Sequence, residues 1–456
     1  MTEPGPAPEA VTTRFRMPHP AVMLFAAVAI AALCTWIIPA GEYQRALNEA
    51  TGRTVVVPGT YAEAEGAPVG FLGVLLAVPR GIAAGADVIA TILFVGGAFV
   101  VIERLGALGR LTATLSRRLG SSGLLAIPVI ATVFAVMGAL ENMQEEIIAL
   151  VPVLLVLGRR IRVDPLTMVA ASAGAAMIGS AFGPTNPYQA GIALKLAEVP
   201  MLEGAGLRGA MWVAGLAVWI AWTLRHARHN RVIVEDADAA TDEVATTRDY
   251  LALACTVGPI VLYAYGALAW DWGFDHLSAV AILGVILVGV VYRLGAERLV
   301  GEFLYGMQAL LPAAMIVALA RSIALVLADG QVIDTILHAA ALPLGRLDPF
   351  ASALLMVPVQ ALIHIPVSSV SGQAALTIPI FAPLADLIGL SRMAAVLAYQ
   401  TGAGLMELLT PTNGALLAVL LAAGVPFQRW IRFAIGGWLL ATAIGVIGIM
   451  FAIAMQ

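Results

Sequence analysis

Charged side chains are scarce in this sequence of 456 residues, of which 12% are Asp, Glu, Lys or Arg and 60% are hydrophobic. Soluble domains carry about 25% charged residues. A share this low excludes a surface that faces water on all sides, and it predicts a membrane protein. Lys195 is the only lysine, so almost all of the positive charge comes from arginine.

Cysteine is nearly absent, and the short motifs of several large protein classes are missing. Cys34 and Cys255 both lie in apolar runs, where they suit helix packing better than a disulfide or a metal site. The sequence has no C-x-x-C, H-E-x-x-H, Walker or Rossmann pattern. We therefore expect no cofactor, no ATP-driven or redox role and no nucleic-acid partner.

Apolar runs, by contrast, fill most of the sequence. A helix needs about 20 apolar residues to span a bilayer. The runs are Ala21–Ile38, Asp87–Ile102, Leu124–Leu140, Ile147–Leu157, Leu166–Phe182, Ala210–Leu224, Leu251–Trp270, Leu277–Tyr292, Met307–Leu327, Phe350–Ile365, Ala374–Ile388, Met393–Leu409, Ala415–Ala423 and Phe433–Ala454. Ile147–Leu157 and Ala415–Ala423 are too short to span alone, and short, interrupted segments point to the binding site of a transporter.

The first apolar run follows two arginines, so a cleaved signal peptide competes with a retained first helix. The run is long for a signal core, and Pro-Ala-Gly-Glu at residues 39–42 makes a poor cleavage site. We expect the helix to be retained. Because Arg14 and Arg16 precede it, we also expect the N-terminus to face the cytoplasm, in an inner (cytoplasmic) membrane.

Basic residues also indicate where the chain turns back. Arginines lie on both flanks of residues 124–157, so this segment enters and leaves on the same, cytoplasmic side. We predict a re-entrant hairpin with its tip near residues 141–146, although a pair of full spans would also return to the same side. By the same reading, residues 350–388 form a second hairpin whose two ends lie outside.

The tripeptide Pro-Thr-Asn occurs twice, at equivalent places. Residues 183–187 read Gly-Pro-Thr-Asn-Pro and residues 410–414 read Thr-Pro-Thr-Asn-Gly, each followed by a short apolar stretch. The match predicts two inverted repeats, each with a re-entrant hairpin and a broken helix, in an all-α protein of about nine full spans. The expected divisions are an N-terminal segment (1–67), repeat 1 (68–229), a cytoplasmic linker (230–249), connecting helices (250–300) and repeat 2 (301–456).

Each break offers groups that can bind ions. A Pro-Thr-Asn break frees backbone carbonyls and amides, which must be satisfied inside the membrane. Carbonyl, Thr and Asn oxygens suit Na⁺, and amides at the N-terminus of a half-helix suit a carboxylate. A plain proline kink is the alternative, but two matched breaks favour a substrate site at Thr185, Asn186, Thr412 and Asn413.

The first hairpin tip is acidic, with Glu141, Asn142, Glu145 and Glu146. Carboxylates at membrane depth cost on the order of 3 kcal/mol each. A solvated turn would avoid this cost, but the basic flanks direct the tip into the protein. We predict that Asn142 binds substrate and that the three glutamates, with Glu407 before the second break, handle a coupling cation, Na⁺ or H⁺.

The second tip is rich in hydroxyl groups. Three serines and a glutamine offer hydrogen bonds and a glycine makes the turn flexible, so we predict a substrate site at Ser368, Ser369, Ser371, Gly372 and Gln373. The amides that open the next helical arm suit a substrate carboxylate, and serine-mediated helix packing is the alternative. Two nearby residues stay open: His364 is either a pH-sensitive ligand or an interior histidine, and Arg321 is either a substrate ligand or an internal ion-pair partner.

Together these motifs resemble the YfcC-like branch of the C4-dicarboxylate anaerobic carrier (DcuC-type) family, within the ion transporter superfamily. The resemblance covers nearly the whole chain. It rests on Met17–Pro20, Ile37–Glu42, Gln144–Glu146, Ser371–Pro379 and Pro411–Gly414. It implies a secondary carrier of carboxylates or amino acids, with arginine/ornithine exchange among the activities of this branch. It further implies a homodimer with an elevator-type scaffold and transport domain.

The first tip departs from the superfamily's sodium-coupled dicarboxylate carriers, which have Ser-Asn-Thr at both tips. An acidic tip together with Glu407 would repel a dicarboxylate unless cations offset it, so an amino acid fits the charge better. We expect a symporter or exchanger of amino acids or small carboxylates that binds its substrate at the two tips. The alternatives are a C4-dicarboxylate carrier, an intramembrane enzyme, for which the histidines are too scattered, and a channel.

Overall fold

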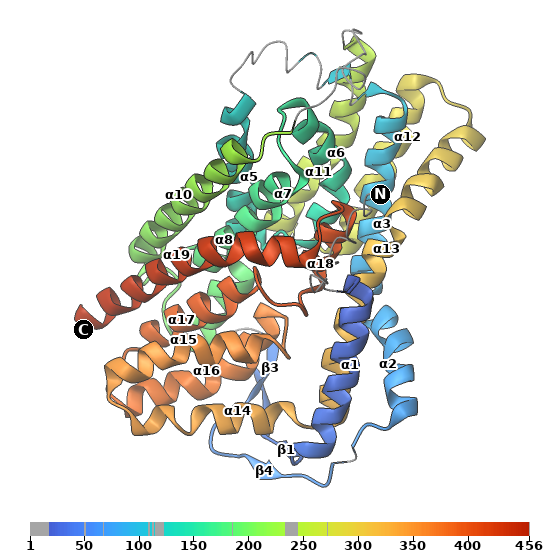
Figure 1. Ribbon diagram of the computed structural model, residues 1–456. Coiled ribbons are helices and arrows are strands. Elements are labelled where there is room, and N and C mark those ends of the chain that lie inside the picture. Colours follow the sequence, from blue (N-terminus) through green and yellow to red (C-terminus); the bar gives the residue numbers. More distant parts are fainter. Residues whose placement is uncertain are drawn as a thin grey trace, which may run out of the picture.

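The computed structural model describes residues 18–49, 52–66, 68–107, 110–111, 114, 123–184, 186–232, 245–270 and 272–455. Thr185 and residues 233–244 of the expected linker lie outside this part of the chain. The described chain is helical apart from four short strands (Figure 1). Eight of its helical segments are long and apolar enough to cross a membrane. The prediction of a multi-pass helical membrane protein is therefore confirmed.

One group of helices forms the side of the molecule drawn in blue and yellow, and we call it the α13 bundle. It contains α1 (Pro20–Ile37), α2 (Phe71–Ala84), α3 (Ala86–Arg104), α11 (Thr247–Trp270), α12 (Phe274–Tyr292) and α13 (Ala296–Asp329). The long helix α13 packs against α1, α2 and α3. Helix α2 is an addition to the helices expected from the sequence, because Pro79 and Arg80 interrupt its apolar run.

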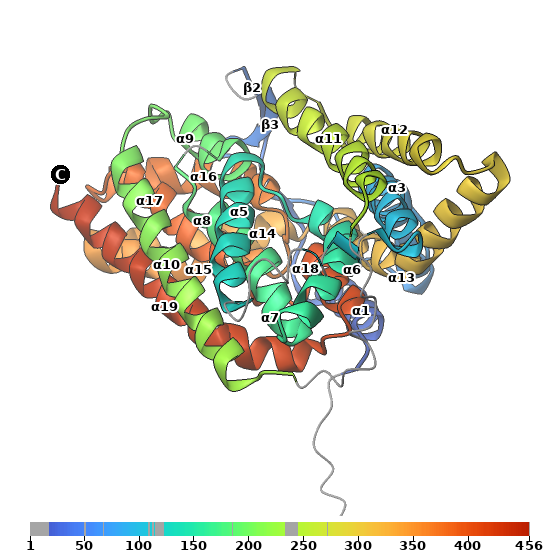
Figure 2. The same cartoon turned by 90° about the horizontal axis from the view of Figure 1, so that it is seen from above.

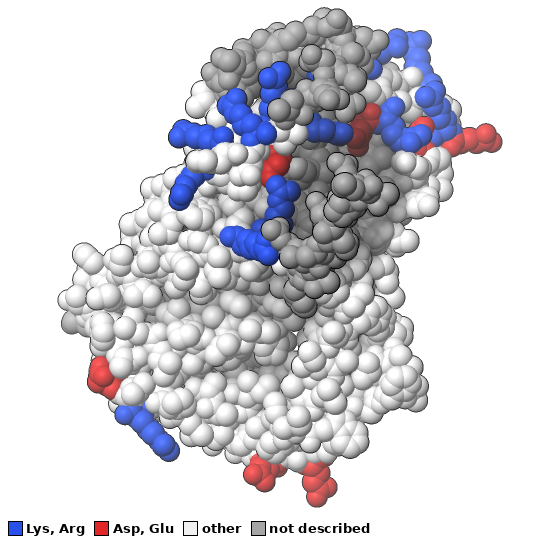
Figure 3. Space-filling model, in the orientation of Figure 1, with Lys and Arg blue, Asp and Glu red and all other residues white. Residues whose placement is uncertain are grey.

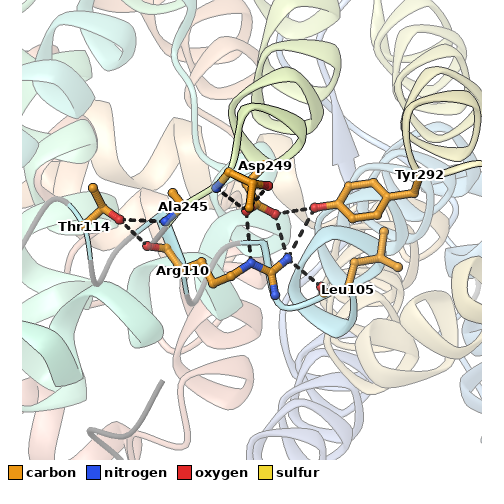
Figure 4. A network of polar contacts seen from close by, with 7 residues as sticks. Leu105, Arg110, Thr114, Ala245, Asp249 and Tyr292 are labelled. Carbon is orange, nitrogen blue, oxygen red and sulfur yellow. Dashed lines mark hydrogen bonds and ion pairs between the residues drawn. The ribbon is translucent and has the colours of Figure 1, made fainter. Parts of the chain in front are cut away.

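A polar network ties several ends of the α13 bundle together (Figure 4). The guanidinium of Arg110 donates to both carboxylate oxygens of Asp249, at 3.0 and 2.6 Å, and the Tyr292 hydroxyl donates to the same carboxylate. Thr114 Oγ1 accepts from the amide of Ala245 at 3.0 Å. The network thus joins the chain after α3 to the start of α11 and the end of α12, and it anchors the described end of the linker.

The acidic loop after α1 contains the strands. β1 (Gly41–Glu42) pairs antiparallel with β4 (Ala62–Glu63), and β2 (Arg45–Asn48) with β3 (Arg53–Val56). The buried carboxylate of Asp334, in the short helix α14 (Ile333–Ala341), accepts from the Tyr43 amide and from Arg45, both at 2.9 Å. The apolar runs in the sequence did not indicate the strands or α14, because neither segment has a long apolar run.

Two helical hairpins lie in the second group of helices. The first joins α5 (Ala126–Glu141) to α6 (Glu145–Arg160), and the second joins α15 (Pro349–His364) to α16 (Val370–Leu387). Both arms of the first hairpin have 16 residues. The second arm, α6, therefore stays shorter than the about 20 residues that a spanning helix needs and is not among the eight candidate spans, as the sequence predicts, although it is longer than its apolar run. Charged residues lie at both ends of α6, so the helix is longer than the apolar run seen in the sequence.

Two broken helices complete the second group. The first runs through α7 (Pro165–Val169), the π-helix η2 (Ala170–Gly174) and α8 (Ala175–Phe182), and resumes as the π-helix η3 (Pro187–Gly191) and α9 (Ile192–Leu196). The second runs through α17 (Arg392–Tyr399) and the π-helix η6 (Gln400–Gly404), and resumes as α18 (Gly414–Ala422). Both interruptions fall at the two tripeptides, as the sequence predicts.

The two halves of the chain correspond element by element. α7 begins after the N-cap Asp164 and α17 after the N-cap Ser391, each at the same distance in sequence before the Asn of its break. Each half ends in a long helix, α10 (Ala205–His229) or α19 (Phe427–Ala454). The short helices η1 (Gly123–Leu125) and η5 (Leu344–Arg346) precede the two hairpins. The repeat suggested by the tripeptides thus extends to the secondary structure.

The second group packs around α8, and we call it the α8 bundle. In it, α5 packs on α8, α10 on α19, and α16 on α17. Two of its helices face the other bundle, since α6 contacts α3 and α18 contacts α13. Figure 2 shows α6 and α18 between the two groups of helices. The second arm of the first hairpin and the stub after the second break therefore lie at the boundary between the bundles.

Charged side chains gather at the two ends of the molecule in Figure 3. Lys and Arg are concentrated at the upper end of the face shown. Arginines also end two of the helices, Arg159 and Arg160 in α6 and Arg104 in α3. The middle of the face shown is almost free of charge, and mainly Asp and Glu appear at the lower end. On the face shown, a basic upper end and an acidic lower end are therefore separated by a band with almost no charged side chains.

Candidate functional site

The first hairpin turns through three residues, Asn142–Gln144. Asn142 has a φ of 57°, in the left-handed region that asparagine tolerates better than most residues. α6 then starts with Glu145 and Glu146, and carboxylates are favourable at a helix N-terminus because of its partial positive charge. A carboxylate oxygen of Glu146 accepts from the backbone amide of Gln144 at 3.2 Å. The acidic tip is thus part of the start of α6.

The second hairpin is tied together by side chains behind its tip. Ser369 is the N-cap of α16, and its hydroxyl accepts from the Gly372 amide at 3.3 Å. Gln373 Oε1 lies 2.8 Å from His364 Nδ1, and Gln373 Nε2 donates to the Gln360 carbonyl at 2.8 Å. Gln373 and His364 are fully buried. These two residues join the arms to each other and leave the serines at the tip.

Each break is held by an asparagine that caps the helix after it. Asn186 Oδ1 accepts from the amides of Tyr188 and Gln189 at 3.0 and 2.7 Å, and its Nδ2 donates to the Gly138 carbonyl at 2.8 Å. Asn413 Oδ1 accepts from the amide of Leu416 at 3.1 Å. Asparagine is among the strongest N-cap residues, which explains why helices restart here after a proline break.

Each break also contacts the hairpin of its own half. Asn186 reaches Gly138, in the last turn of α5, while Thr412 Oγ1 donates to the Ile365 carbonyl at 2.6 Å, just after α15. The first break is held from the other side as well. The buried guanidinium of Arg208 donates to the Pro184 carbonyl at 3.1 Å. Nothing in the sequence pattern singled out Arg208, because an arginine near a helix start is ordinary.

One set of contacts crosses from the first half to the second. The side-chain amide of Gln144 donates to the carboxylate of Glu407, and Gln144 Oε1 accepts from Asn413 Nδ2 at 3.4 Å. Asn413 Nδ2 also lies 3.3 Å from the Glu407 carbonyl oxygen. Glu407 is only 4% exposed. The first hairpin tip and the second break therefore form one polar cluster.

A cavity of about 430 Å³ opens beside this cluster. Its walls come from both hairpin tips, from the second break and from α11, α12 and α13 of the other bundle. They are formed by Glu141, Asn142, Gln144, Glu145, Glu146, Tyr188, Tyr263, Trp272, Gly273, Phe274, Val317, Ala320, Arg321, Ala324, Val367, Ser368, Ser369, Val370, Ser371, Glu407, Asn413, Gly414 and Ala415. The cavity thus lies at the boundary between the α13 and α8 bundles.

The titratable side chains in the cavity wall are mostly acidic. Four glutamates line it, and Arg321 on α13 is the one arginine among the lining residues. Within the described ranges, no three His, Cys, Asp or Glu side chains come close enough to hold a metal ion together. The arrangement suits a ligand that carries positive charge and can also accept hydrogen bonds from serine hydroxyls and from amides at the start of α16.

The structure brings most of the predicted site residues to this cavity. Those that line it are Glu141, Asn142, Glu145, Glu146, Arg321, Ser368, Ser369, Ser371, Glu407 and Asn413. Asn186, His364, Gly372, Gln373 and Thr412 are outside its lining and hold the hairpins and breaks in place. Thr185 lies outside the described residues. Asn186 of the first break therefore holds the last turn of α5 near the first tip, and Tyr188 just after it reaches the cavity.

The sequence missed five lining residues with polar or aromatic groups, Gln144, Tyr188, Tyr263, Trp272 and Phe274. Gln144 sits inside the acidic tip, so its position alone was a usable signal. Tyr263 and Trp272 belong to α11 and to the turn before α12. No short motif marks them, because only the packing of the two bundles brings them to the cavity.

Comparison with known proteins agrees with a transporter. Residues 17–456 match the model of a family described as DcuC, C4-dicarboxylate anaerobic carrier. An Escherichia coli (strain K12) protein named "Putative basic amino acid antiporter YfcC" is 28% identical, over 97% of this chain and 96% of its own length. An uncharacterized protein of Haemophilus influenzae is 25% identical, over 92% of this chain and 93% of its own.

A solved structure also aligns along almost the whole chain. It is the crystal structure of the YdaH transporter of Alcanivorax borkumensis, which is 16% identical and aligns with a TM-score of 0.44. The alignment covers 96% of this chain and 99% of that one.

Proposed function

This chain belongs to the DcuC family of C4-dicarboxylate anaerobic carriers, and on that premise we propose that it is a secondary active transporter of cationic amino acids. The 430 Å³ cavity is the proposed substrate site. The family is one of membrane transporters, so the enzyme alternative falls away. The single observation that carries the choice of substrate is the excess of carboxylates over cationic groups in the cavity wall.

Four glutamates in a cavity at membrane depth need positive charge. A cationic amino acid brings a guanidinium or ammonium group, its α-ammonium and one carboxylate. In our proposal the side-chain cation lies among the glutamates of the first tip. The substrate carboxylate lies at the second tip, where Ser369 and Ser371 offer hydroxyls and the start of α16 offers amides. The printed name of the Escherichia coli relative supports the same substrate class.

A C4-dicarboxylate is the second candidate, favoured by the family's own description and by Arg321 in the cavity wall. A dianion beside four glutamates would need several protons or cations to bind with it. We therefore rank it second. The same glutamates serve as the proposed coupling sites, through which Na⁺ or H⁺ would move with or against the substrate.

Transport requires the cavity to open to each side in turn. We propose that the α8 bundle is the moving transport domain and the α13 bundle the scaffold, because the cavity lies on their boundary. The two hairpins would be re-entrant, within two inverted repeats (68–229 and 301–456) and about nine full spans. The basic end of the molecule would face the cytoplasm, and the carrier would be a homodimer, as in related carriers.

The test is uptake by purified full-length protein in proteoliposomes. Labelled arginine, ornithine, alanine and succinate are each supplied with and without Na⁺, with and without a pH gradient, and with unlabelled substrate inside. We expect arginine and ornithine to be taken up. Uptake of succinate alone would replace the proposal by the dicarboxylate candidate, and uptake of none of the four in any condition would contradict both.

A matched set of variants tests the site itself. Glu146→Gln and Glu407→Gln remove carboxylates from the cavity, whereas Glu203→Gln removes one from an exposed position outside the cavity lining. We expect arginine uptake to fall at least about tenfold in the first two variants and to stay unchanged in the third. Normal uptake by both cavity variants would show that the cavity is not the substrate site.

A further inference from the structure

A second cavity, of about 270 Å³, lies between the last turns of α10 and the second turn of α19. Four of its lining residues carry cationic or titratable basic groups, Arg225, His226, His229 and Arg432. Its apolar walls are Trp222 and Phe433. This cavity shares no lining residue with the 430 Å³ cavity.

The two arginines of this cavity, Arg225 and Arg432, keep their charge at an exposed position. In the described part of the chain, neither Arg225 nor Arg432 forms an ion pair with a carboxylate. The guanidinium of Arg225 lies over the ring of Trp222, 5.6 Å from its centre. Both side chains are exposed. Two guanidinium groups in the wall of one cavity repel each other, so an anion bound in the cavity would be favourable.

A carboxylate near the cavity is already engaged. His226 Nε2 lies 3.4 Å from Asp164 Oδ2, but that oxygen also accepts from Arg429 Nη2 at 2.7 Å. Asp164 is buried and does not line the cavity. The negative charge of Asp164 is thus offset by Arg429, and among the described residues no carboxylate forms an ion pair with the two arginines of the cavity.

The apolar walls of the cavity are rigid. Trp222 Nε1 donates to the Phe433 carbonyl at 2.9 Å, which locks the two helices in register. A Cβ on Gly436 would come within 2.4 Å of the Trp222 ring, so α19 approaches this tryptophan closely because a glycine is there. His226 packs edge-on against Phe433, with ring centres 5.0 Å apart. The cavity is therefore preformed.

An apolar stripe continues from the cavity along α19. Ile435 and Leu439 follow Arg432 at helical spacing on the same face, and their exposed fractions are 45% and 56%. α10 and α19 are both candidate membrane spans. Exposed large apolar side chains on such helices face lipid tails. The basic cavity and the apolar stripe beside it thus match the two parts of a phospholipid, a charged headgroup and an acyl chain.

We propose that this cavity binds the phosphate-bearing headgroup of an anionic phospholipid, with an acyl chain along the α19 stripe. Arg225 and Arg432 would bind the phosphate oxygens, since guanidinium groups suit phosphate geometry. Basic pockets between membrane helices are known sites for anionic headgroups. A free phosphate shares the headgroup chemistry, but it would make no use of the stripe. The site does not depend on the transported substrate.

The experiment measures lipid binding to the full-length protein by native mass spectrometry from detergent. The variant Arg225→Gln/Arg432→Gln is compared with Arg228→Gln/Arg231→Gln, which removes the same charge from the same end outside the cavity. We expect phosphatidylglycerol to bind at least about tenfold more tightly than phosphatidylcholine. The cavity variant should lose this preference, and the control variant should keep it.

Two further arms identify the source of the phosphate group. Inorganic phosphate at millimolar concentration should not displace phosphatidylglycerol, and a photoactivatable phosphatidylglycerol should crosslink to peptides of α10 and α19 in the unmodified protein. Displacement by inorganic phosphate would show a free-anion site and overturn the lipid proposal. The proposal would also be overturned if the cavity and control variants lost the preference for phosphatidylglycerol equally, or if both lipids bound equally well. Either result would mean that general surface charge explains the binding.

Discussion

Gln144 donates its side-chain amide to the carboxylate of Glu407, and the two residues come from different halves of the chain. Both are buried. A buried carboxyl without a hydrogen-bond partner is costly, so this contact stabilises Glu407 at the cavity wall. Because Gln144 also accepts from Asn413, the geometry of the first hairpin tip depends directly on the second break.

Removing either partner of this pair should weaken the protein. A buried polar group that loses its partner costs about 1–3 kcal/mol. We therefore expect Gln144→Leu and Glu407→Leu each to lower the melting temperature and to abolish uptake. The double variant should be more stable than the sum of the two losses predicts, because replacing both partners by apolar groups leaves nothing unpaired.

Thermal unfolding of the four proteins in one detergent measures this coupling. Met143→Leu serves as the control, since Met143 is in the same turn and packs against apolar residues. It should melt like the unmodified protein. Strictly additive losses in the double variant would contradict an energetic link between the two halves.

Arg208 should be essential for the shape of the first break. Its buried guanidinium donates to the backbone carbonyls of Pro184, Met201 and Glu203. Arg208→Met keeps much of the apolar stem and leaves these carbonyls without donors, at about 1–3 kcal/mol for each buried group. We expect a clear drop in melting temperature and reduced uptake. Arg208→Lys, with fewer donors and no fork, should recover only part of the loss.

Arg228→Met is the matched control for this prediction. It removes the same side chain from an exposed position of the same helix. Melting can be followed by the fluorescence of the tryptophans. If Arg208→Met and Arg228→Met melt alike, the contact of Arg208 with the break does not stabilise the fold.

Two glycines set the close approach of α5 and α8. A Cβ on Gly138 would lie 2.1 Å from the Ala176 carbonyl oxygen, and a Cβ on Gly179 would lie 2.0 Å from that of Ala135. We expect Gly138→Ala and Gly179→Ala each to cost at least about 1–3 kcal/mol, the usual range for overpacking. Both should lower uptake, because Gly138 also accepts from Asn186 at the first break.

Gly209→Ala, in α10, is the control, because nothing lies within 4 Å of the added Cβ. It should be neutral or more stable by up to about 1 kcal/mol. The measurement is the melting temperature, with uptake as a second readout. Equal behaviour of all three variants would mean that the two helices can separate at little cost.

The stability contributed by Asp164 should depend on pH. Burial alone would raise the pKa of the Asp164 carboxyl, but hydrogen bonds from His226 and Thr167 outweigh it and hold the pKa below its ordinary value of 3.8. A lowered pKa means that the folded state favours the carboxylate. The carboxylate therefore stabilises the fold above about pH 3.8, and this contribution is lost as the pH falls further.

We accordingly expect Asp164→Asn to melt below the unmodified protein at neutral pH. The difference in melting temperature between the variant and the unmodified protein should narrow as the pH falls from about 4 towards 3, because the Asp164 side chain then also loses its charge. Asp348→Asn is the control, since Asp348 is also an N-cap, of α15, at an exposed position. A gap for Asp164→Asn that stays constant or widens at low pH would contradict the prediction.

The elements that the sequence predicted well are those with a local cause. The breaks at the two tripeptides are correct because proline stops a helix and the asparagine two residues later caps the next one. The acidic and serine-rich tips are correctly placed in hairpin turns, because polar residues interrupt apolar runs there. α2, α14 and the strands were missed, because their apolar runs are short or interrupted.

The sequence predicted some residues of the cavity wall, but it did not separate them from polar residues that only support the structure. Residues at the tips, such as Glu145 and Ser369, do line the cavity. Gln373 and Asn186 have the same polar character, but the structure uses their amides to join hairpin arms and to cap a break. A sequence pattern gives the residue type and the depth in the membrane. It does not give the direction of the side chain.

The sequence by itself determined that this protein is a helical membrane transporter with a duplicated plan, because apolar runs, basic flanks and repeated tripeptides are local signals. Only the tertiary structure decided that the acidic tip meets the second break through Gln144 and Glu407, and that Tyr263 and Trp272 close the cavity. These contacts join residues more than a hundred positions apart. They depend on how the two bundles pack, and no local pattern encodes that packing.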